Sequence, residues 1–338
     1  MEIRRNREIF SYFDRCRANL SNERINSFLN RRVTPASETC VRRQLSKAGV
    51  PEFAGSEADW PSLFIRVDEW ENHPYHRTVT DRLRTLSGVY ETEEFEGQRL
   101  FNSDAVQPDV NKELNDWMKL RALDRAAQTI VLVSNGIEWM LDAPGESITN
   151  DPPAEKAHGR VVTFGLGIGY YLFMALRNPE VDHVTVIEKD PAVIETFRNH
   201  LQPLFPDHNR FTIQTGDAMD FWNKAYLSSF DSIYADIWQS SDDGLFLMHE
   251  LLKRYNPPHE AVDFWIEDSC VVPLRTLIFL HYEELVYRTR RQVNPDYEEL
   301  MQCVRRWFKK DSRIIDNPQD LKEMMYDRKV LRAILGGN

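Results

Sequence analysis

VVTFGLGIGYYLFMAL, residues 161–176, contains three kinds of sequence in a row. It opens with β-branched and aromatic residues, continues through Gly165, Gly167 and Gly169, and ends in an apolar run without Gly or Pro. This order predicts a buried strand, a tight glycine turn and a helix. Glycines at such a turn allow positive φ and let a ligand approach the main chain, while the following helix offers free N–H groups. The turn is therefore either a ligand-binding turn or a purely structural one.

The sequence after the turn alternates between strand and helix patterns. Further strands are expected at 184–187, 211–214, 230–235 and 262–266. Helices are expected from Pro191, where a missing N–H costs little at the first turn, and from about Leu245. This alternation predicts an α/β fold with a doubly wound, Rossmann-like parallel sheet, in which ligands lie outside the carboxyl ends of the strands.

Acidic residues follow the predicted strands. Glu188 comes after the second strand, Asp217 after the third, Asp236 after the fourth and Glu267-Asp268 after the fifth. Each acid alone could be a solvated strand end or a helix cap. Because the carboxyl ends of parallel strands share one edge of the sheet, the set predicts a binding site there.

The segments on either side complete the expected organisation. Residues 1–128 look mainly helical, with Trp117, Leu120 and Leu123 at helical spacing and one strand-like alternation at 89–101. Residues 269–338 look like a helical extension, which leaves 129–268 as the Rossmann-like domain.

That central domain opens with a predicted hairpin. Residues 129–141 have two apolar runs around Asn135-Gly136, a strong hairpin signal. Residues 142–159 are rich in Pro, Gly and small polar residues and predict a loop beside the binding edge. Glu146 and Thr149 in this loop could line the same cleft.

Composition limits the possible functions. The 338 residues are 42% hydrophobic and 28% charged, and 42 basic against 53 acidic residues give a net charge of −11. This balance is typical of a globular protein and argues against nucleic acid or an anionic membrane as a partner. The N-terminus lacks the apolar core of a signal peptide, and no segment is apolar enough to span a bilayer.

Cysteine and histidine spacing predicts neither disulfides nor a metal site. The four cysteines are far apart, which favours a reducing compartment, so the cytoplasm is expected. His73 and His76 are close, but Pro74 lies between them and no neighbouring carboxylate or cysteine cluster completes a metal site.

The glycine turn and the acids after strands two to four resemble the class I S-adenosylmethionine-dependent methyltransferases and the polyamine synthases (spermidine synthase-like proteins) that share their fold. The resemblance covers residues 129–268. It implies S-adenosylmethionine as cofactor, with the glycine turn against its amino acid and ribose parts. Glu188 would take both ribose hydroxyls, Asp217 and Ala218 would contact adenine, and Asp236 would face the sulfonium and the acceptor. The implied cofactor-binding set is Gly165, Leu166, Gly167, Gly169, Glu188, Lys189, Asp217, Ala218, Asp236 and Trp238, with Asp236 also catalytic.

A glycine turn followed by an acid also suits a dinucleotide such as NAD. That fingerprint needs Gly or Ala at its sixth position, where this chain has Tyr170, a ring that would hinder approach to a pyrophosphate. S-adenosylmethionine is therefore the favoured ligand.

Three functions remain open at this stage. The favoured one is methyl transfer to a small-molecule acceptor, with Asp236 as a base if the acceptor must lose a proton. The second is aminopropyl or aminocarboxypropyl transfer, although Ile168 stands where polyamine synthases carry an acid in the turn. The third is a non-catalytic protein that retains cofactor binding. A homodimer is possible.

Overall fold

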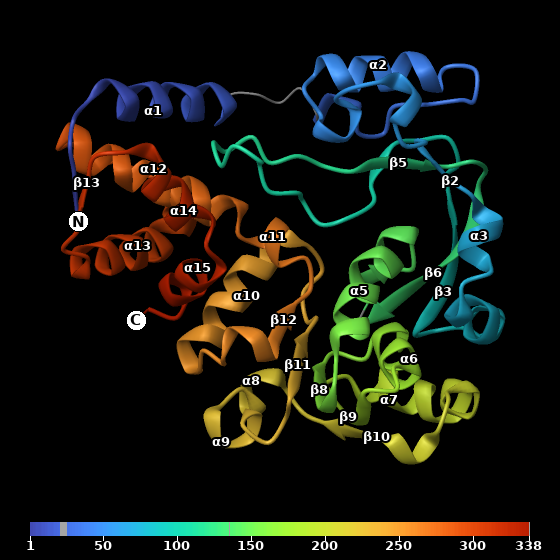
Figure 1. The fold of residues 1–338 in the computed structure, drawn as a ribbon. Helices are drawn as coiled ribbons and strands as arrows, with labels where there is room; N and C mark the ends of the chain where they lie inside the picture. Colours follow the sequence, from blue (N-terminus) through green and yellow to red (C-terminus); the bar gives the residue numbers. More distant parts are fainter. Residues whose placement is uncertain (21–25, 135, 338) are drawn as a thin grey trace.

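The computed structural model describes residues 1–20, 26–134 and 136–337, and its centre is a five-stranded parallel sheet (Figure 1). Every adjacent pair of strands in this sheet is parallel. The α/β fold with a doubly wound parallel sheet is therefore confirmed. The strands lie in the order β10 (Phe211–Thr215), β9 (Val181–Glu188), β8 (Gly159–Phe164), β11 (Ser232–Ala235) and β12 (Val262–Phe264).

Alternating side chains of the sheet enter two separate cores. Val161 packs into one cluster with residues of α6 (Tyr170–Arg177), while its neighbour Val162 packs into the other with residues of α10 (Ser241–Arg254) and α12 (Val272–Tyr287). Successive strand residues point to opposite faces, so near-continuous apolar strands need a helical layer on each side. The strand and helix pattern after residue 160 was predicted correctly.

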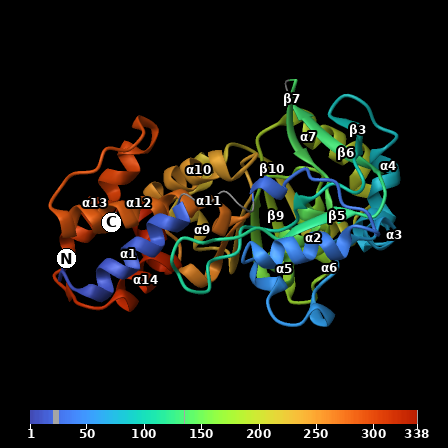
Figure 2. The same ribbon diagram turned by 90° about the horizontal axis from the view of Figure 1, so that it is seen from above.

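The C-terminal part of the chain forms the predicted helical extension. After α12 come α13 (Glu298–Lys310), α14 (Pro318–Tyr326) and α15 (Arg328–Leu335). The first helix, α1 (Arg7–Leu20), packs on this extension through an edge-to-face contact of Phe13 with Phe279, whose ring centroids are 5.5 Å apart. The two ends of the chain therefore lie in the same half of the molecule (Figures 1 and 2). Near these two ends, strand β1 (Glu2–Ile3) pairs in parallel with strand β13 (Ile314–Ile315).

The N-terminal region contains more strand than its pattern suggested. The predicted alternation at 89–101 corresponds to β3 (Tyr90–Phe95) and β4 (Phe101–Asn102). The helical expectation at Trp117, Leu120 and Leu123 was wrong, because Leu120–Leu123 is strand β5, paired between β2 (Phe64–Ile65) and β4. Here the pairing partners override the spacing of the apolar residues.

The predicted hairpin is present. β6 (Ala127–Ser134) pairs antiparallel with β7 (Ile137–Leu141), and β3 adds to the other side of β6. Gly136 has a φ of +75°, as a tight turn requires, while Asn135 lies outside the described residues. The division of the chain at residues 128 and 268 stays a prediction.

The predicted loop before β8 was wrong. Residues Pro144–Lys156 form helix α5, which packs against α6 in spite of Pro152 and Pro153. Its buried residues are spaced as one helical face, namely Pro144, Ser147, Asn150 and Ala154. Pro144 sits at the start of the helix, where proline is favourable, and packing of the buried face outweighs the bonds that the internal prolines remove.

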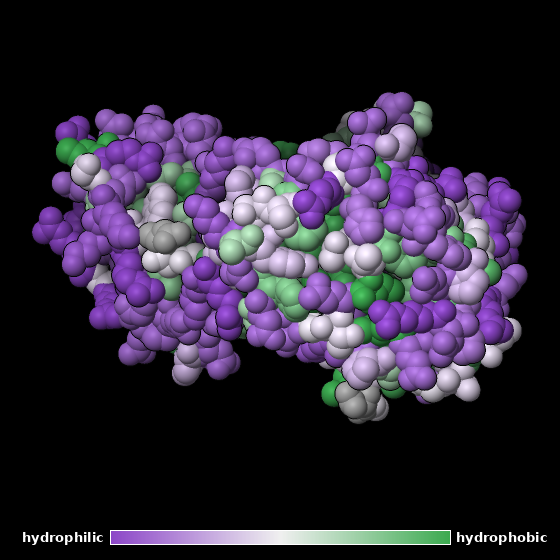
Figure 3. Space-filling view, turned by 90° about the horizontal axis from the view of Figure 1, so that it is seen from below, coloured by the Kyte–Doolittle hydropathy of each residue, from purple (hydrophilic) through white to green (hydrophobic). Residues whose placement is uncertain are grey.

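Hydrophilic residues cover most of the face of the elongated molecule shown in Figure 3, and apolar residues gather over the broader half, at the right of the view. No described helix has the length and apolar character needed to cross a membrane.

Candidate functional site

A cavity of about 1340 Å³ opens at the carboxyl ends of the parallel strands. The residues that follow β8, β9, β10 and β11 all contribute to its wall, and α5 and the β6–β7 hairpin complete it. Glu146 and Thr149 line it from α5. The position is the one expected for a ligand of a doubly wound sheet. The predicted site residues on the wall are Gly165, Leu166, Gly167, Glu188, Lys189, Asp217, Ala218, Asp236 and Trp238.

The glycines of the turn have different roles. Gly165 has a φ of +96°, and a Cβ there would overlap the carbonyl oxygen of Asp236, so the ends of β8 and β11 can approach only with glycine. Gly169 caps α6 with a φ of +82° and does not line the cavity. A Cβ on Gly169 would lie 2.7 Å from Cζ of Phe205. The third predicted glycine therefore packs against the helix layer instead of facing the cavity.

Two buried tyrosines from the N-terminal region hold the turn in place. The hydroxyl of Tyr75 donates a hydrogen bond to the carbonyl of Ile168 at 2.7 Å, and that of Tyr90 donates to the carbonyl of Gly167 at 2.9 Å. Both side chains are fully buried. Sequence reasoning missed them, because nothing in a single sequence links residues 75 and 90 to a turn about 80 positions later.

Glu188 also supports the turn. Its Oε2 accepts a hydrogen bond from the backbone N–H of Leu166 at 2.9 Å, and its Oε1 accepts one from the N–H of Asp190 at 2.8 Å. A carboxylate oxygen has two lone pairs, so each oxygen can still accept a hydroxyl. Glu188 therefore fixes the backbone around the cavity and keeps the capacity to bind a diol.

The other predicted binding residues surround this carboxylate. Asp217 Oδ1 accepts from Met219 N–H at 2.9 Å, which makes Asp217 the N-cap of the short helix α8 (Ala218–Phe221). Lys189 places its ammonium 5.6 Å from the ring centroid of Trp139. Trp238 is 3% exposed and packs near Phe264, with its indole N–H unpartnered among the described residues. Asp217 and Trp238 thus serve the fold as well as lining the cavity.

Asp236 and Glu146 are the least satisfied acids of the cavity. Among the described residues, the carboxylate of Asp236 accepts no hydrogen bond, and burial raises its pKa from 3.8 to about 7. Burial, together with the charges of Asp236 and Asp142, also holds the pKa of Glu146 well above its usual value. A carboxyl group with a pKa near 7 can exchange protons at neutral pH.

The acids after the fifth strand do not join this site. Arg332 donates to both oxygens of Glu267 at 2.7 and 2.6 Å. Asp268 is paired with Arg275 at 2.8 Å and with Arg328. These arginines come from the helical extension, so Glu267 and Asp268 attach that extension to the sheet.

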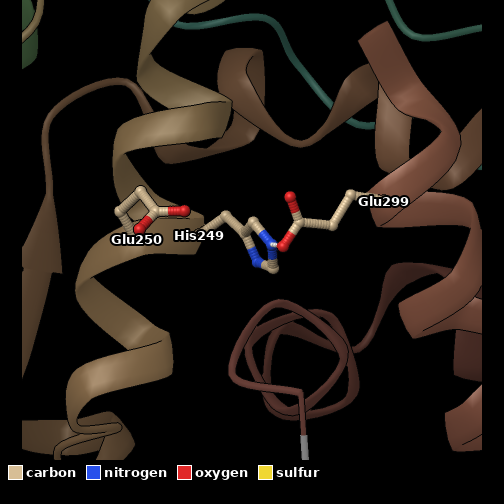
Figure 4. A group of neighbouring side chains, drawn as sticks. All are labelled: His249, Glu250 and Glu299. Atoms are coloured by element: carbon tan, nitrogen blue, oxygen red, sulfur yellow. Dashed lines mark hydrogen bonds and ion pairs between the residues drawn. The ribbon is translucent and has the colours of Figure 1, made fainter. Parts of the chain in front are cut away.

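One group of possible metal ligands occurs among the described residues, outside the cavity: His249, Glu250 and Glu299 (Figure 4). The imidazole points toward Glu299 and its Nδ1 donates to the carbonyl of Leu335 at 2.6 Å. The ammonium of Lys253 contacts Glu250 at 2.6 Å and Glu299 at 3.1 Å. Because the lysine already contacts both carboxylates and the imidazole bonds to a carbonyl, the group is better explained as a tie between α10, α13 and α15.

Comparison with known proteins gives partial matches. The chain is 31% identical over 105 residues to putrescine N-methyltransferase 2 of Nicotiana attenuata, which covers 30% of this chain and 27% of that protein. It is 32% identical over 160 residues to spermidine synthase of Dictyostelium discoideum, covering 42% of this chain and 54% of that protein. These matches confirm the resemblance to class I S-adenosylmethionine-dependent methyltransferases, with kinship to spermidine synthase-like proteins. No protein-family model matches the chain.

The similarity is confined to part of each protein. The match spans about a quarter of the putrescine N-methyltransferases and about half of the spermidine synthase. Among solved structures, spermidine synthase from Thermotoga maritima aligns with 20% identity and a TM-score of 0.30, over 41% of this chain and 48% of that one.

Proposed function

We propose that this chain is an S-adenosylmethionine-dependent methyltransferase whose acceptor is a small molecule that carries an amine. The observation that carries the proposal is the charge of the cavity. Among the described residues that line it, Lys189 is the single basic side chain. The acids on the wall are Asp104, Glu146, Glu188, Asp190, Asp217 and Asp236. Such a wall favours a cationic sulfonium and a cationic acceptor.

The cofactor would lie along the ends of β8, β9 and β10. Glu188 would accept hydrogen bonds from the ribose hydroxyls, because each of its oxygens keeps a free lone pair beside its backbone donor. The adenine would lie against Asp217 and Ala218. S-adenosylmethionine bound there would supply a methyl group activated by its positive sulfur. The cavity suits a cofactor with an apolar base and a positive sulfur, since its wall is mixed apolar and acidic.

The acceptor would lie near Asp236 and Glu146. An ammonium has no lone pair, so its nitrogen must lose a proton before it can form a bond to carbon. Asp236, with a pKa near 7, takes that proton first, and the freed lone pair then forms the N–C bond as the S–C bond breaks and its electrons return to sulfur. S-adenosylhomocysteine leaves as the second product. The chain's main contribution is to hold the nitrogen in line with the methyl group.

Aminopropyl transfer is the second candidate. The match to a spermidine synthase covers 42% of this chain, against 30% for the putrescine N-methyltransferase. Ile168 in the turn and the sequence Asp236-Ile237-Trp238-Gln239-Ser240 after β11 depart from the pattern of polyamine synthases. These departures make methyl transfer the first candidate.

We further propose that the protein works in the cytoplasm on small molecules. A reducing compartment suits its four free cysteines, of which Cys16, Cys270 and Cys303 are buried. The net charge of −11 disfavours nucleic acid as the acceptor.

The test is calorimetric titration with S-adenosylmethionine, S-adenosylhomocysteine, methylthioadenosine and NAD, followed by product analysis with a panel of small amines. We expect S-adenosylhomocysteine to bind tightly and to accumulate together with a methylated amine. Accumulation of methylthioadenosine would establish alkyl transfer instead. Binding without turnover across the panel would favour a non-catalytic protein, and binding of NAD alone would refute the cofactor assignment.

A further inference from the structure

A second, smaller cavity of about 300 Å³ lies in the N-terminal region. Its wall comes from one short stretch of chain: α3 (Val67–Glu71), the π-helical turn His76–Thr80 and α4 (Asp81–Leu83) with the arginine that follows. The volume is at the lower end of those that hold small ligands. The lining residues are Trp70, Glu71, His76, Arg77, Thr80, Asp81 and Arg84.

Four of these side chains have a buried polar atom without a hydrogen-bond partner among the described residues. The atoms are Nε1 of Trp70, Nδ1 of His76, Oγ1 of Thr80 and Nε of Arg84. Trp70, His76 and Thr80 are only 7%, 5% and 5% exposed. A buried polar group left unpaired costs about 1 to 3 kcal/mol, so four of them around one cavity need an explanation.

The donor character of three of these atoms indicates what would satisfy them. The indole N–H of Trp70 and the Nε–H of Arg84 can only donate, and the hydroxyl of Thr80 can donate. Nε2 of His76 lies 3.2 Å from Oδ1 of the buried Asp142. A group with several lone pairs satisfies the three donors of Trp70, Thr80 and Arg84.

The surrounding charges allow an anion. Arg84 donates through Nη2 to Glu71 at 3.3 Å and to the carbonyl of Gln128 at 3.1 Å, and through Nη1 to Asp81 at 3.5 Å, which leaves its Nε for a ligand. Arg77 lines the opening, is exposed, and forms no ion pair with the described residues. The Asp81 side chain also contacts Arg84 but is 92% exposed, so solvent screens its charge.

We propose that this cavity is a binding site for a small oxyanion of the carboxylate or phosphate type, held by the buried donors of Trp70, Thr80 and Arg84. The site is separate from the cavity at the strand ends and does not depend on the proposed transfer reaction. Charge-assisted hydrogen bonds to such an anion are about twice as strong as neutral ones, which offsets the cost of the buried donors.

The test uses the indole N–H of Trp70 as a reporter in ¹H–¹⁵N NMR spectra of the full chain. The signal is one of eight tryptophan indoles and is identified by its loss in Trp70→Phe. Sodium acetate and inorganic phosphate are titrated in turn, with sodium chloride at the same ionic strength as the reference. We expect a saturable shift of the Trp70 signal with acetate or phosphate and none with chloride. Whichever anion gives the shift identifies the chemistry as carboxylate or phosphate.

Two matched variants show whether the shift reports this cavity. Thr80→Val removes one donor at nearly constant volume and should weaken binding at least tenfold, since a hydrogen bond to a charged group contributes about 1.5 to 3 kcal/mol. Thr78→Val, on the exposed side of the same turn, should leave the affinity unchanged. Asp236→Asn, in the main cavity, should also leave it unchanged.

Three outcomes would overturn the proposal. The first is a Trp70 signal that does not move with either anion, which would mean that the cavity holds water alone. The second is equal affinity in Thr80→Val and the wild-type chain. The third is an altered affinity in Asp236→Asn, which would place the anion in the larger cavity.

Discussion

The acids at the carboxyl edge of the central sheet fall into two groups with opposite surroundings. After β11, Asp236 faces the large cavity and accepts no hydrogen bond from the described residues. After the neighbouring β12, Glu267 is 5% exposed and is held on both oxygens by Arg332. Both side chains end in a carboxyl group at the same edge of the sheet, and they differ in whether a cation is paired with it.

The difference shows how an acid at a strand end becomes available for chemistry. Arg275 of α12 and Arg332 of α15 lie against the end of β12. They pair with the acids there, and these ion pairs attach the helical extension to the sheet. No described arginine lines the cavity beyond β8, β9 and β11. An unpaired acid in a partly buried cavity keeps a raised pKa, whereas an acid paired in the interior is a structural tie. The following predictions test this contrast.

The largest effect is expected for Asp236→Asn. The amide keeps the size of the side chain but cannot take a proton, so turnover should fall by about 100-fold to 10,000-fold. Affinity for S-adenosylhomocysteine should change much less. Single-turnover rates and calorimetry on the same preparation separate the two quantities, and an equal loss of both would make Asp236 a binding residue only.

Arg332→Met tests the paired group. It leaves Glu267 buried without its cation, and loss of one partner of a buried ion pair costs about 3 to 5 kcal/mol of the free energy of unfolding. Urea denaturation measures the loss. Lys329→Met is the control on the same helix, because its partner Glu260 is exposed and the pair should not contribute measurably. Adding Glu267→Gln to Arg332→Met should restore part of the stability; no recovery would show that Arg332 acts through packing and not through its charge.

How far the sequence predicts this structure depends on the range of the interactions. The alternation after residue 160 predicted the parallel sheet, since each strand and helix there carries its own periodic signal and turn residues. The secondary structure before residue 160 was harder to predict from the sequence. Strand β5 depends on pairing with β2 and β4, and α5 depends on packing against α6, so local composition indicated a helix for the first and a loop for the second.

The candidate site divides in the same way. Its acids and glycines follow strands directly, so position in the sequence predicted where they lie. The roles of Tyr75 and Tyr90, by contrast, depend on contacts with a turn far along the chain. The pairing of Glu267 with Arg332 also joins residues 65 positions apart. Such contacts leave no mark in one sequence.

Glu188→Ala should have a smaller effect than the first two variants. It removes one or two charged hydrogen bonds to the ribose, so cofactor affinity should fall by roughly tenfold to a hundredfold. Glu195→Ala is the control, because Glu195 is exposed on the helix that follows and does not line the cavity. Calorimetric titration compares both with the wild type. Unchanged affinity in a folded Glu188→Ala protein would remove Glu188 from the site.

The last prediction concerns the pH dependence of stability. The pKa of Asp236 is raised from 3.8 to about 7, so between these values the unfolded chain releases a proton that the folded chain keeps. The free energy of unfolding should therefore fall as the pH rises from about 4 to 7 and should level off above pH 7. The slope from this group corresponds to a difference of at most one bound proton between the folded and unfolded chains. The raised pKa of Glu146 acts in the same direction. Urea denaturation of the wild type and Asp236→Asn across this range isolates the contribution of Asp236, since the amide cannot titrate.

The opposite sign is expected wherever a carboxylate is held by a cation, as Glu284 is by Arg305, because its pKa is lowered to about 2 and its contribution is lost as the pH falls. If Asp236→Asn and the wild type show the same slope, Asp236 is solvated in the folded chain, and the contrast between open and paired acids fails at its main member.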